Sequence, residues 1–492
     1  MSLLGIDVGT TTLKAGLYGD DGSVQAAVLH EYGQLSAFHP DDLWSALRAA
    51  IAKARAAVPS AEIRAVAISS HGESVVPLDE RGRPLSAFIV NTDCRGVAEA
   101  EAFARHFGKM ALFERTGLPV HPMYTLIKLA HLKASDPGLF AQAKHFRCVE
   151  DWILERAGVG AFISASLASR TMAMDVSAAT WAADLTAFAD VDERALSRLA
   201  HSAAPLGYAS PRAAAELGLP AGALWVVGGH DQGCCSLGAG GWRDQVAVDG
   251  TGTFECISLS VARPFLTAEA LRFNFSTERH AAGGRFLTPV YCPGGIVLKW
   301  FRDVLSSAQK AEAAAGGRDA YDVILEDFPD DPTELTVFPY LIGAGTPSLA
   351  TEARGSILGL TASTTYPELA KAVLEGVTCE MQWNLLLQRQ IGVEIERIHA
   401  VGGGARSAAW LQLKADVFGC PVTVVPGEAS CAGAAMCAGI GLGLFRDVAE
   451  ASRAFVRPGR VFEPRPHQHA LYQEKVARHI ELARRVYGFS VA

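Results

Sequence analysis

The sequence predicts an α/β fold made of two domains, with a ligand cleft between them. Its 492 residues exceed what a single hydrophobic core supports, so more than one domain is expected. Short apolar runs alternate with amphipathic stretches in both halves, as in α/β folds. A glycine–threonine turn that follows a β-favouring run ending in aspartate occurs twice, at residues 6–12 and 248–253. Because the pattern restarts at Gln245, we place the domains at residues 1–245 and 246–492.

The first half contains short apolar strands and an amphipathic helix. The predicted strands lie at residues 3–8, 14–18, 65–69 and 223–227. The helix covers residues 41–57, where Leu43, Leu47 and Ile51 recur at helical spacing after Pro40. The first glycine–threonine turn therefore joins the first two strands.

The second half contains helices and strands around a glycine-rich loop. Thr365 and Glu368 form a capping-box sequence at the start of a long helix. The other predicted elements are a strand at 398–401, a glycine loop at 402–404, a helix from the N-cap Ser407 to Gly419, and an amphipathic helix at 468–487. We expect the helix at 468–487 to pack back on the first domain.

The repeated turn has the chemistry of a phosphate-binding hairpin. Glycine lets backbone amides approach an anion closely, and threonine adds a hydroxyl donor beside each amide. Two such turns facing each other across a cleft would hold the triphosphate of ATP from both sides. The groups expected to contact the phosphates are Thr10, Thr11 and Thr12 on one side and Gly250, Thr251 and Gly252 on the other. Either turn taken alone is also compatible with an ordinary hairpin.

Asp231 is the candidate catalytic base. It lies just past the carboxyl end of the predicted strand at residues 223–227, and ligands bind at such ends in open α/β sheets. A carboxylate there could accept the proton of the substrate hydroxyl that receives the phosphate. Taken alone, the same aspartate is also compatible with a cap on the following helix. Asp7 is placed to hold Mg²⁺, directly or through water, and the loop at residues 402–404 leaves room for adenine.

Composition narrows the classes of function. The formal net charge of −8, without a Lys/Arg cluster, argues against a nucleic-acid-binding surface. No apolar run approaches the ~20 residues needed to span a bilayer, so we expect no membrane partner. Asp7 and Lys14 interrupt the apolar N-terminus, which argues against a signal peptide. The ten cysteines contain no CxxC pair and are best explained as reduced thiols, so we expect a cytoplasmic protein.

These residues and several longer motifs resemble the FGGY family of carbohydrate kinases over nearly the whole chain. Residues 123–132 match one family signature, with His131 where relatives usually carry tryptophan. The second signature is complete at residues 355–360 and 368–375. Further similar segments are residues 402–407 with 414–416, and Gly294-Gly295 ahead of residues 300–303. The resemblance implies the actin/hexokinase/Hsp70-like ATPase fold: two actin-like ATPase (ribonuclease H-like) domains with a nucleotide and sugar cleft between them.

The resemblance also implies a chemistry. Family members use ATP and Mg²⁺ to phosphorylate a terminal hydroxyl of a small sugar or polyol. By position, Asp231 matches the family's catalytic base and Asp7 its metal-associated aspartate. The nucleotide-binding residues that the resemblance implies are Gly9, Thr10, Thr11, Thr12, Lys14, Gly250, Thr251, Gly252, Gly295, Gly403, Gly404 and Ser407.

The acceptor is indicated by a few residues of the first half. The stretch Ser70-His71-Gly72 resembles the Met-His-Gly of xylulose kinases more than the Gln-Arg-Glu of glycerol kinases, which favours a ketose. The substrate-binding residues that the resemblance implies are His71, Gly72, Asp93, Arg95, Asp231, Gln232 and Phe254. His71 is also compatible with a satisfied core histidine, and Arg95 with a salt-bridge partner. Relatives commonly carry Glu-Arg where this chain has Ala344-Gly345, so contacts made by those charges are missing.

The leading prediction is an ATP-dependent ketopentose kinase, with D-xylulose as the first candidate acceptor. Alternatives with the same chemistry are a kinase for a hexulose, a deoxyketose, gluconate or a polyol. An alternative of another class is a non-catalytic or chaperone-like nucleotide switch on the same fold. The element Gly229-His230-Asp231-Gln232 and both signatures speak against a switch. Relatives are often oligomers, so a homodimer is an expectation that rests on the resemblance alone.

Overall fold

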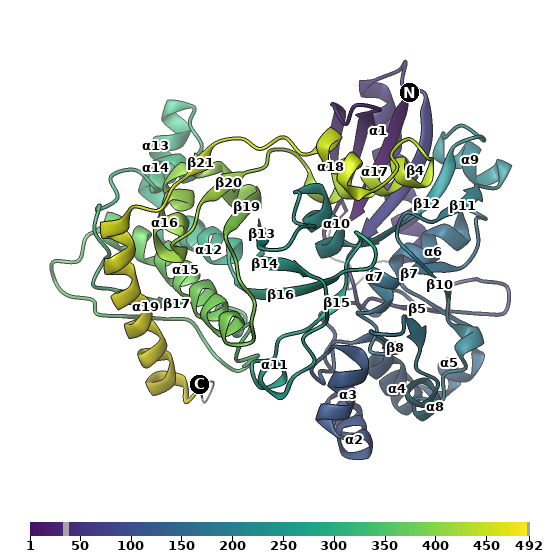
Figure 1. Cartoon of the computed structure of the whole chain (residues 1–492), viewed down its shortest axis with the longest axis horizontal. Coiled ribbons are helices and arrows are strands. Elements are labelled where there is room, and N and C mark those ends of the chain that lie inside the picture. Colours follow the sequence, from purple (N-terminus) through teal and green to yellow (C-terminus); the bar gives the residue numbers. More distant parts are fainter. Residues whose placement is uncertain (33–38, 490–492) are drawn as a thin grey trace.

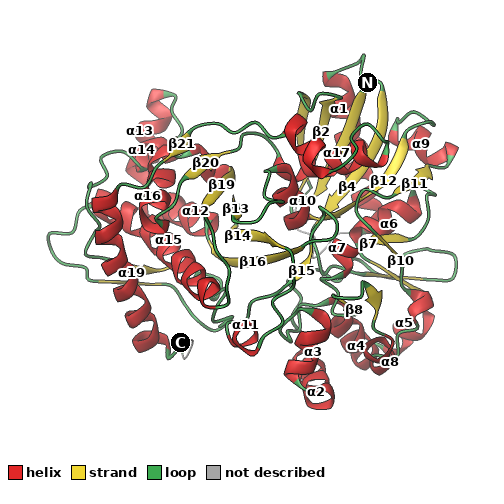
Figure 2. Ribbon diagram, in the orientation of Figure 1, coloured by secondary structure: helices red, strands yellow, loops and turns green. Residues whose placement is uncertain are grey.

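A computed structural model describes residues 1–32 and 39–489 and contains two α/β domains that lie side by side (Figure 1). Each domain is built around one large sheet with helices packed on it (Figure 2). The predicted fold class, α/β with two domains, is confirmed. The second sheet begins at Val246, directly after the boundary that the repeated turn suggested.

The first sheet has six strands. They are β1 (Ser2–Val8), β2 (Thr12–Gly19), β3 (Val24–Glu31), β4 (Ile63–Ser70), β11 (Pro205–Tyr208) and β12 (Leu224–His230). Their order is β11-β12-β4-β1-β2-β3, with β1, β4 and β12 parallel to one another. The carboxyl ends of these three strands therefore meet at one edge, where Asp7, His71 and Asp231 lie.

The second sheet has seven strands. They are β13 (Val246–Thr251), β14 (Phe254–Val261), β15 (Glu278–Arg279), β16 (Phe286–Pro293), β19 (Arg397–Gly402), β20 (Val422–Val424) and β21 (Val461–Phe462). Their order is β15-β16-β14-β13-β19-β20-β21. The hairpin β13–β14 and its parallel neighbour β19 repeat the arrangement of β1–β2 beside β4. Both glycine–threonine turns therefore lie at equivalent places in the two sheets.

Helices and short strands complete the domains. The helices are α1 (Pro40–Ala57), α2 (Val97–Phe107), α3 (Lys109–Thr116), α4 (Thr125–Ser135), α5 (Pro137–Gln142), α6 (Val149–Arg156), α7 (Ala165–Ala168), α8 (Ala183–Phe188), α9 (Pro211–Leu217), α10 (Asp231–Gly238), α11 (Ala268–Arg272), α12 (Gly295–Leu305), α13 (Ser307–Gly316), α14 (Ala320–Ile324), α15 (Tyr366–Gln390), α16 (Ala408–Phe418), α17 (Ala429–Gly441), α18 (Val448–Phe455) and α19 (Pro466–Tyr487), with 3-10 turns η2 (Glu193–Ala195) and η3 (Gly403–Arg406). The short strands are β5 (Val76–Leu78), β6 (His145–Arg147), β7 (Phe162–Ser164), β8 (Met174–Asp175), β9 (Thr180–Trp181), β10 (Arg198–Ala200), β17 (Thr336–Phe338) and β18 (Ser356–Leu358). Among the described residues, no helix is both long and apolar enough to cross a bilayer.

Helix α17 returns from the second half of the chain to the first domain. It packs against β1, β4, β12 and α10, and α18 follows it there (Figure 1). The contact is backbone to backbone: a Cβ added at Gly5 would lie 1.9 Å from the Cys431 carbonyl oxygen, and one at Gly238 would lie 2.0 Å from that of Ala429. Small residues at the crossing bring α17 and α10 this close.

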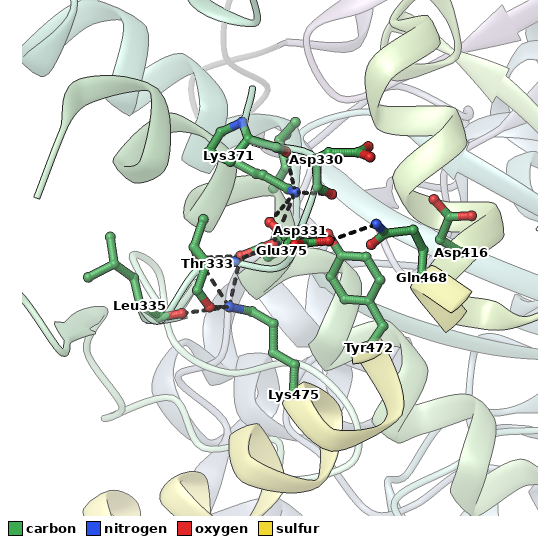
Figure 3. Close-up of polar contacts among 12 residues, drawn as sticks. Asp330, Asp331, Thr333, Leu335, Lys371, Glu375, Asp416, Gln468, Tyr472 and Lys475 are labelled. Carbon is green, nitrogen blue, oxygen red and sulfur yellow. Dashed lines mark hydrogen bonds and ion pairs between the residues drawn. The ribbon is translucent and has the colours of Figure 1, made fainter. Parts of the chain in front are cut away.

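The predicted packing of the last helix on the first domain is wrong. Helix α19 lies against α15 and α16, where Tyr472, Val476 and Ala483 are buried in the core of the second domain. Polar contacts hold it there (Figure 3): Lys475 Nζ lies 2.8 Å from Glu375 Oε2, and the Tyr472 hydroxyl donates to Glu375 Oε1 at 3.0 Å. The amphipathic stripe correctly predicted a packed helix, but its partner is the face of α15 that carries Glu375.

Candidate active site

The first hairpin exposes its tip. Its turn is closed by the Gly9 N–H, which donates to the Thr12 carbonyl oxygen at 2.9 Å, and the Tyr32 hydroxyl donates to the carbonyl oxygen of Gly9. Thr10 and Thr11 are exposed at the tip. Their amides and hydroxyls are therefore accessible to an anion, as the predicted phosphate contact requires.

Asp7 lies buried at the base of this hairpin. Ser69 Oγ–H donates to its Oδ1 at 2.7 Å, and its cross-strand partner is Lys14. Burial, followed by the negative charge of Asp231, raises the pKa of Asp7 to about 6, while Lys14 opposes the shift. Lys14 is itself shared with Glu428, which lies 2.7 Å away. Asp7 and Asp231 repel each other electrostatically, and a bound cation would relieve this repulsion, so the carboxylates fit the chemistry of Mg²⁺.

The second hairpin is fixed from inside its own domain. Lys414 Nζ lies 2.5 Å from Asp249 Oδ2, 3.2 Å from Glu255 Oε2 and 3.0 Å from Thr251 Oγ1. Lys414 is 1% exposed, and Asp249 and Glu255 are completely buried. Burial and the charge of Asp249 raise the pKa of Glu255 to about 8, because one ammonium group faces two carboxylates. The Thr251 hydroxyl is therefore engaged inside the protein, and the exposed groups of this turn are Gly252 and Thr253.

Glycines bring neighbouring elements against the second hairpin. The Gly295 N–H, at the start of α12, donates to the Gly252 carbonyl oxygen at 2.9 Å, and an added Cβ would lie 2.2 Å from that oxygen. A Cβ at Gly404 would lie 2.6 Å from Thr251 Cγ2, whereas Gly403 has nothing within 4 Å of an added Cβ. Ser407 caps α16 by accepting the Trp410 N–H at 3.3 Å. Gly403 is thus the glycine of this loop at which an added Cβ would meet open space.

Asp231 is the first residue of α10 and follows a kink in β12. The pairing of β12 with β4 shifts register between Val226 and Gly229. A Cβ at Gly228 would lie 1.8 Å from the Ile68 carbonyl oxygen, and the Gly228 N–H donates to the buried Glu150 carboxylate at 3.0 Å. The two glycines therefore direct the chain across β4, and Asp231 lies at the sheet edge.

The two hairpins and Asp231 meet at α10. Asp7 and Asp231 act on each other electrostatically, and both act on the thiol of Cys235 in α10. Burial, then the charges of Asp7 and Asp231, raise the pKa of Cys235 to about 12. A Cβ at Gly250 would lie 3.9 Å from Cys235 Sγ, so the second hairpin borders the same helix. Asp7, Asp231 and the second turn therefore converge at the boundary between the domains.

His71 and Gly72 lie near His230 and Asp231. A Cβ at Gly72 would lie 3.2 Å from His230 Nε2. His71 Nδ1 is 3.0 Å from the Val8 carbonyl oxygen and its Nε2 is 2.9 Å from Ser74 Oγ. Burial lowers the pKa of His71, which keeps the ring neutral. Both ring nitrogens therefore have protein partners, and direct substrate contact by His71 stays a prediction.

The other predicted substrate residues lie in varied surroundings. Arg95 Nη2 pairs with Asp93 Oδ2 at 2.6 Å, and the Arg95 side chain is 72% exposed. Phe254 is exposed and packs edge-to-face on Tyr291, with ring centroids 5.9 Å apart. Gln232 is half-buried on α10. Their contacts with a sugar stay predictions.

The sequence prediction gave no role to several charged residues of the site. Lys414 had a usable signal, because it lies four residues after Trp410 and three before Val417 on an apolar helical stripe, where a charge implies a buried partner. Arg170 and Glu278 had none. Their partners lie far away in the sequence and meet only in the folded chain.

Family models match both domains. The N-terminal domain of the FGGY family of carbohydrate kinases matches residues 2–238, and its C-terminal domain matches residues 247–442. The chain belongs to the FGGY family of carbohydrate kinases. As a carbohydrate kinase, it is a phosphotransferase that uses ATP and has an alcohol group of a small sugar as acceptor.

Named relatives of this FGGY kinase differ in their substrates. A gluconokinase of Bacillus licheniformis is 30% identical over 445 residues, covering 88% of this chain and 86% of the relative. A xylulose kinase of Staphylococcus epidermidis is 25% identical over 492 residues, covering 96% and 94%. The crystal structure of a xylulose kinase from Lactobacillus acidophilus superposes with a TM-score of 0.89 at 23% identity, covering 99% and 98% of the two chains. The fold is therefore shared, while the acceptor differs within the family.

Proposed function

We propose that this kinase phosphorylates a terminal hydroxyl of a neutral ketose, with a ketopentose such as D-xylulose as the first candidate. The observation that carries the proposal is the charge balance around Asp231. Arg170 lies 2.5 Å from Glu73 and 3.1 Å from Glu278. His230 lies 3.1 Å from Asp231 and 2.9 Å from Glu278. Both cations beside the base are therefore already neutralised by carboxylates.

Two further cations are also engaged. Lys128 is buried and donates to the backbone carbonyl oxygens of Glu73, at 3.1 Å, and Met123. Arg95 is paired with Asp93. The carboxylate of a sugar acid would have to compete with these partners, which costs desolvation and weakens existing hydrogen bonds. A neutral sugar needs no such exchange, so the charge balance favours a ketose.

Each residue has a proposed role. Asp231 accepts the proton of the attacking hydroxyl, and the exposed tips of the two hairpins bind the ATP phosphates. Asp7 would hold Mg²⁺, which neutralises the charge of the phosphates when bound. The ten cysteines all have free thiols, which supports a reducing, cytoplasmic location. A homodimer stays a prediction that rests on the resemblance alone.

An acceptor screen tests the proposal. Purified enzyme with ATP and Mg²⁺ is assayed for ADP release with D-xylulose, other ketoses, polyols and D-gluconate, and kcat/KM is compared. We expect a ketopentose to exceed gluconate by about 10²-fold or more, because an unsatisfied buried polar group costs about 1–3 kcal/mol and a charged one costs more. A larger kcat/KM for gluconate would overturn the assignment to a neutral ketose. Asp231→Asn is the matched control, because it should abolish phosphorylation while ATP binding remains.

Gluconate is the second candidate, because the gluconokinase relative is 30% identical. Arg95 is the cation best able to serve a sugar acid, since its exposed side chain is held only by Asp93. If gluconate is the acceptor, Arg95→Met should raise its KM at least tenfold, a loss of ~1.4 kcal/mol. With D-xylulose as acceptor, the same substitution should leave KM within about twofold, because an exposed ion pair contributes little.

A further inference from the structure

Five charged side chains form a continuous chain that ends at the proposed base. Glu73 pairs with Arg170 at 2.5 Å, and Arg170 with Glu278 Oε2 at 3.1 Å. Glu278 Oε1 lies 2.9 Å from His230 Nδ1, and His230 Nε2 lies 3.1 Å from Asp231 Oδ1. The first four side chains are buried, with Glu278 completely inaccessible, and Asp231 alone reaches solvent. This series of ion pairs therefore leads from the protein interior to Oδ1 of Asp231.

Glu278 belongs to the second sheet, whereas the other four residues belong to the first domain. Strand β15 carries it across the domain boundary. Two backbone contacts fix this strand on the first domain: the Thr277 N–H donates to the Gly117 carbonyl oxygen at 2.8 Å, and the Arg279 N–H donates to Ser169 Oγ at 3.1 Å. The base on one domain is therefore bound, through one imidazole, to a carboxylate from the other.

The contacts of His230 require both ring nitrogens to carry a proton. Nδ1 is hydrogen-bonded to Glu278 Oε1, and Nε2 lies within ion-pair distance of Asp231 Oδ1, so the imidazolium is the form that suits both neighbours. Burial alone would lower the pKa of His230, but the charges of Glu278 and Asp231 raise it to about 9. Oδ1 of Asp231 is held by this charged contact, while Oδ2 has no hydrogen bond to the described residues. Oδ2 is thus the oxygen left for a substrate hydroxyl.

We propose that Glu278 is a positioning residue for the phosphoryl transfer: through His230 it fixes Oδ1 of Asp231, so that the second domain sets the orientation of the base on the first. This inference rests on the proposed function, in which Asp231 is the base. Glu278 itself touches neither the sugar nor ATP in this scheme. A misplacement of a reacting group by about 1 Å costs about 10²-fold in rate, so the orientation of Asp231 has a measurable effect.

The test compares two buried glutamates that both become glutamine. Glu278→Gln keeps the shape of the side chain and removes its charge. Glu375→Gln is the matched control: Glu375 is also completely buried, lies 2.8 Å from Lys475 and accepts the Thr333 N–H at 3.1 Å, in the second domain's own network (Figure 3). We expect Glu278→Gln to lower kcat by about 10²-fold with KM for ATP and sugar within about threefold. Glu375→Gln should lower the resistance to urea and leave kcat within about twofold.

The pH profile separates positioning from stability. The charged groups that face His230 are Asp231 on α10, Glu278 on β15, Arg170 after α7 and His71 after β4. In the wild type, kcat should hold as pH rises until His230 loses its proton near pH 9. In Glu278→Gln the imidazolium loses its main stabilising charge, so the fall should move to lower pH. Glu375→Gln should keep the wild-type profile.

A second variant keeps the inference testable if Glu278→Gln does not fold. In His230→Gln the side chain can still donate one hydrogen bond to Asp231 but carries no charge. This variant should have a lower kcat and should not show the decrease of kcat near pH 9. The inference is overturned if folded Glu278→Gln, or His230→Gln in its place, matches Glu375→Gln in kcat and pH profile while the wild type is an active kinase. Failure of the proposed function is distinct, because the wild type itself would then prefer gluconate to the ketoses or phosphorylate no ketose.

Discussion

The two glycine–threonine hairpins share a sequence pattern but have opposite surroundings. Asp7 of the first hairpin accepts one hydroxyl hydrogen bond from Ser69 and shares Lys14 with Glu428. Asp249 of the second hairpin is completely buried and paired with Lys414 at 2.5 Å. The first aspartate therefore has coordination capacity left for a cation, whereas the second is used to hold its own turn.

Repetition of a motif therefore does not imply repetition of its chemistry. Both turns expose residues at their tips, Thr10 and Thr11 in the first and Gly252 and Thr253 in the second, where a phosphate could approach them. The environment behind the turn decides the role of the aspartate. Behind Asp7 lies the second carboxylate, Asp231, and behind Asp249 lies the buried ammonium group of Lys414. We therefore expect substitutions of Asp7 to affect activity and substitutions around Asp249 to affect stability.

Lys414→Met should have the largest effect on stability. It leaves Asp249 and Glu255 buried without their cation, and removal of one partner from a buried pair costs about 3–5 kcal/mol. Urea unfolding followed by circular dichroism measures this loss.

The equivalent charge at the first hairpin provides the control. Lys14 and Glu428 are 31% and 40% exposed, so Lys14→Met should lower the free energy of unfolding by no more than about 1 kcal/mol. Equal losses in the two variants would contradict the distinction between the hairpins.

Asp7→Asn should have the next largest effect, on activity. Loss of the carboxylate removes the proposed Mg²⁺ ligand, and removal of one electrostatic group from an active site costs about 10²–10³-fold in kcat. Stability should rise, because a charge disfavoured by burial and by Asp231 disappears. Steady-state kinetics and urea unfolding of the same preparation measure both.

Asp249→Asn should show the reverse pattern. It removes the charge of Asp249 that faces the buried Lys414, so it should lower the free energy of unfolding more than it lowers kcat of the folded enzyme. An Asp249→Asn enzyme that is fully stable but inactive would show that the second aspartate also works in the chemistry.

The pKa of Asp7 predicts a pH-dependent difference in stability. The folded-state pKa of Asp7, about 6, lies above the ordinary value of 3.8. The protonated carboxyl therefore contributes its full share to the free energy of unfolding below pH 3.8, and this contribution is lost as pH rises through 6. Across this window the wild type should lose about 3 kcal/mol relative to Asp7→Asn. Urea midpoints of both proteins between pH 4 and 7, without nucleotide and Mg²⁺, measure the difference. If the urea midpoints of the two proteins changed with pH in the same way, the pKa of Asp7 would not be raised in the folded protein.

The features that were predictable from the sequence are those with local signals. The capping box of Thr365 and Glu368 is present at the start of α15, since it depends on four consecutive residues. The strand that carries Asp7 and the N-cap at Ser407 depend on similarly short patterns. Such signals are fixed by the backbone geometry of a single turn, and tertiary packing does not alter them.

The features that were not predictable depend on distant contacts. The apolar stripe of α19 indicates that the helix is packed but not against which neighbour, so the predicted return to the first domain was wrong. Glu278 meets Arg170 and His230 only because β15 crosses the domain boundary. No local spacing encodes such a meeting, whereas the charge of Lys414 on an apolar stripe did encode a buried partner.

The smallest expected effects come from the glycine loop that packs on the second hairpin. A Cβ at Gly404 would lie 2.6 Å from Thr251 Cγ2, so Gly404→Ala forces the hairpin to shift and should lower the free energy of unfolding by about 1–3 kcal/mol. Gly403 has nothing within 4 Å, so Gly403→Ala should change the free energy of unfolding by less than about 1 kcal/mol. Thermal or urea unfolding of both variants measures the contrast.

Nucleotide binding by the same two variants identifies the face on which adenine lies. If adenine packs on the accessible Gly403, the new methyl group of Gly403→Ala should raise the KM for ATP by roughly tenfold, a loss of ~1.4 kcal/mol, in a protein of normal stability. Gly404→Ala should instead weaken the binding of ATP only as far as it displaces Thr251. A Gly403→Ala enzyme with unchanged KM for ATP would place adenine elsewhere, and the glycine loop would then serve only to let η3 approach the second hairpin.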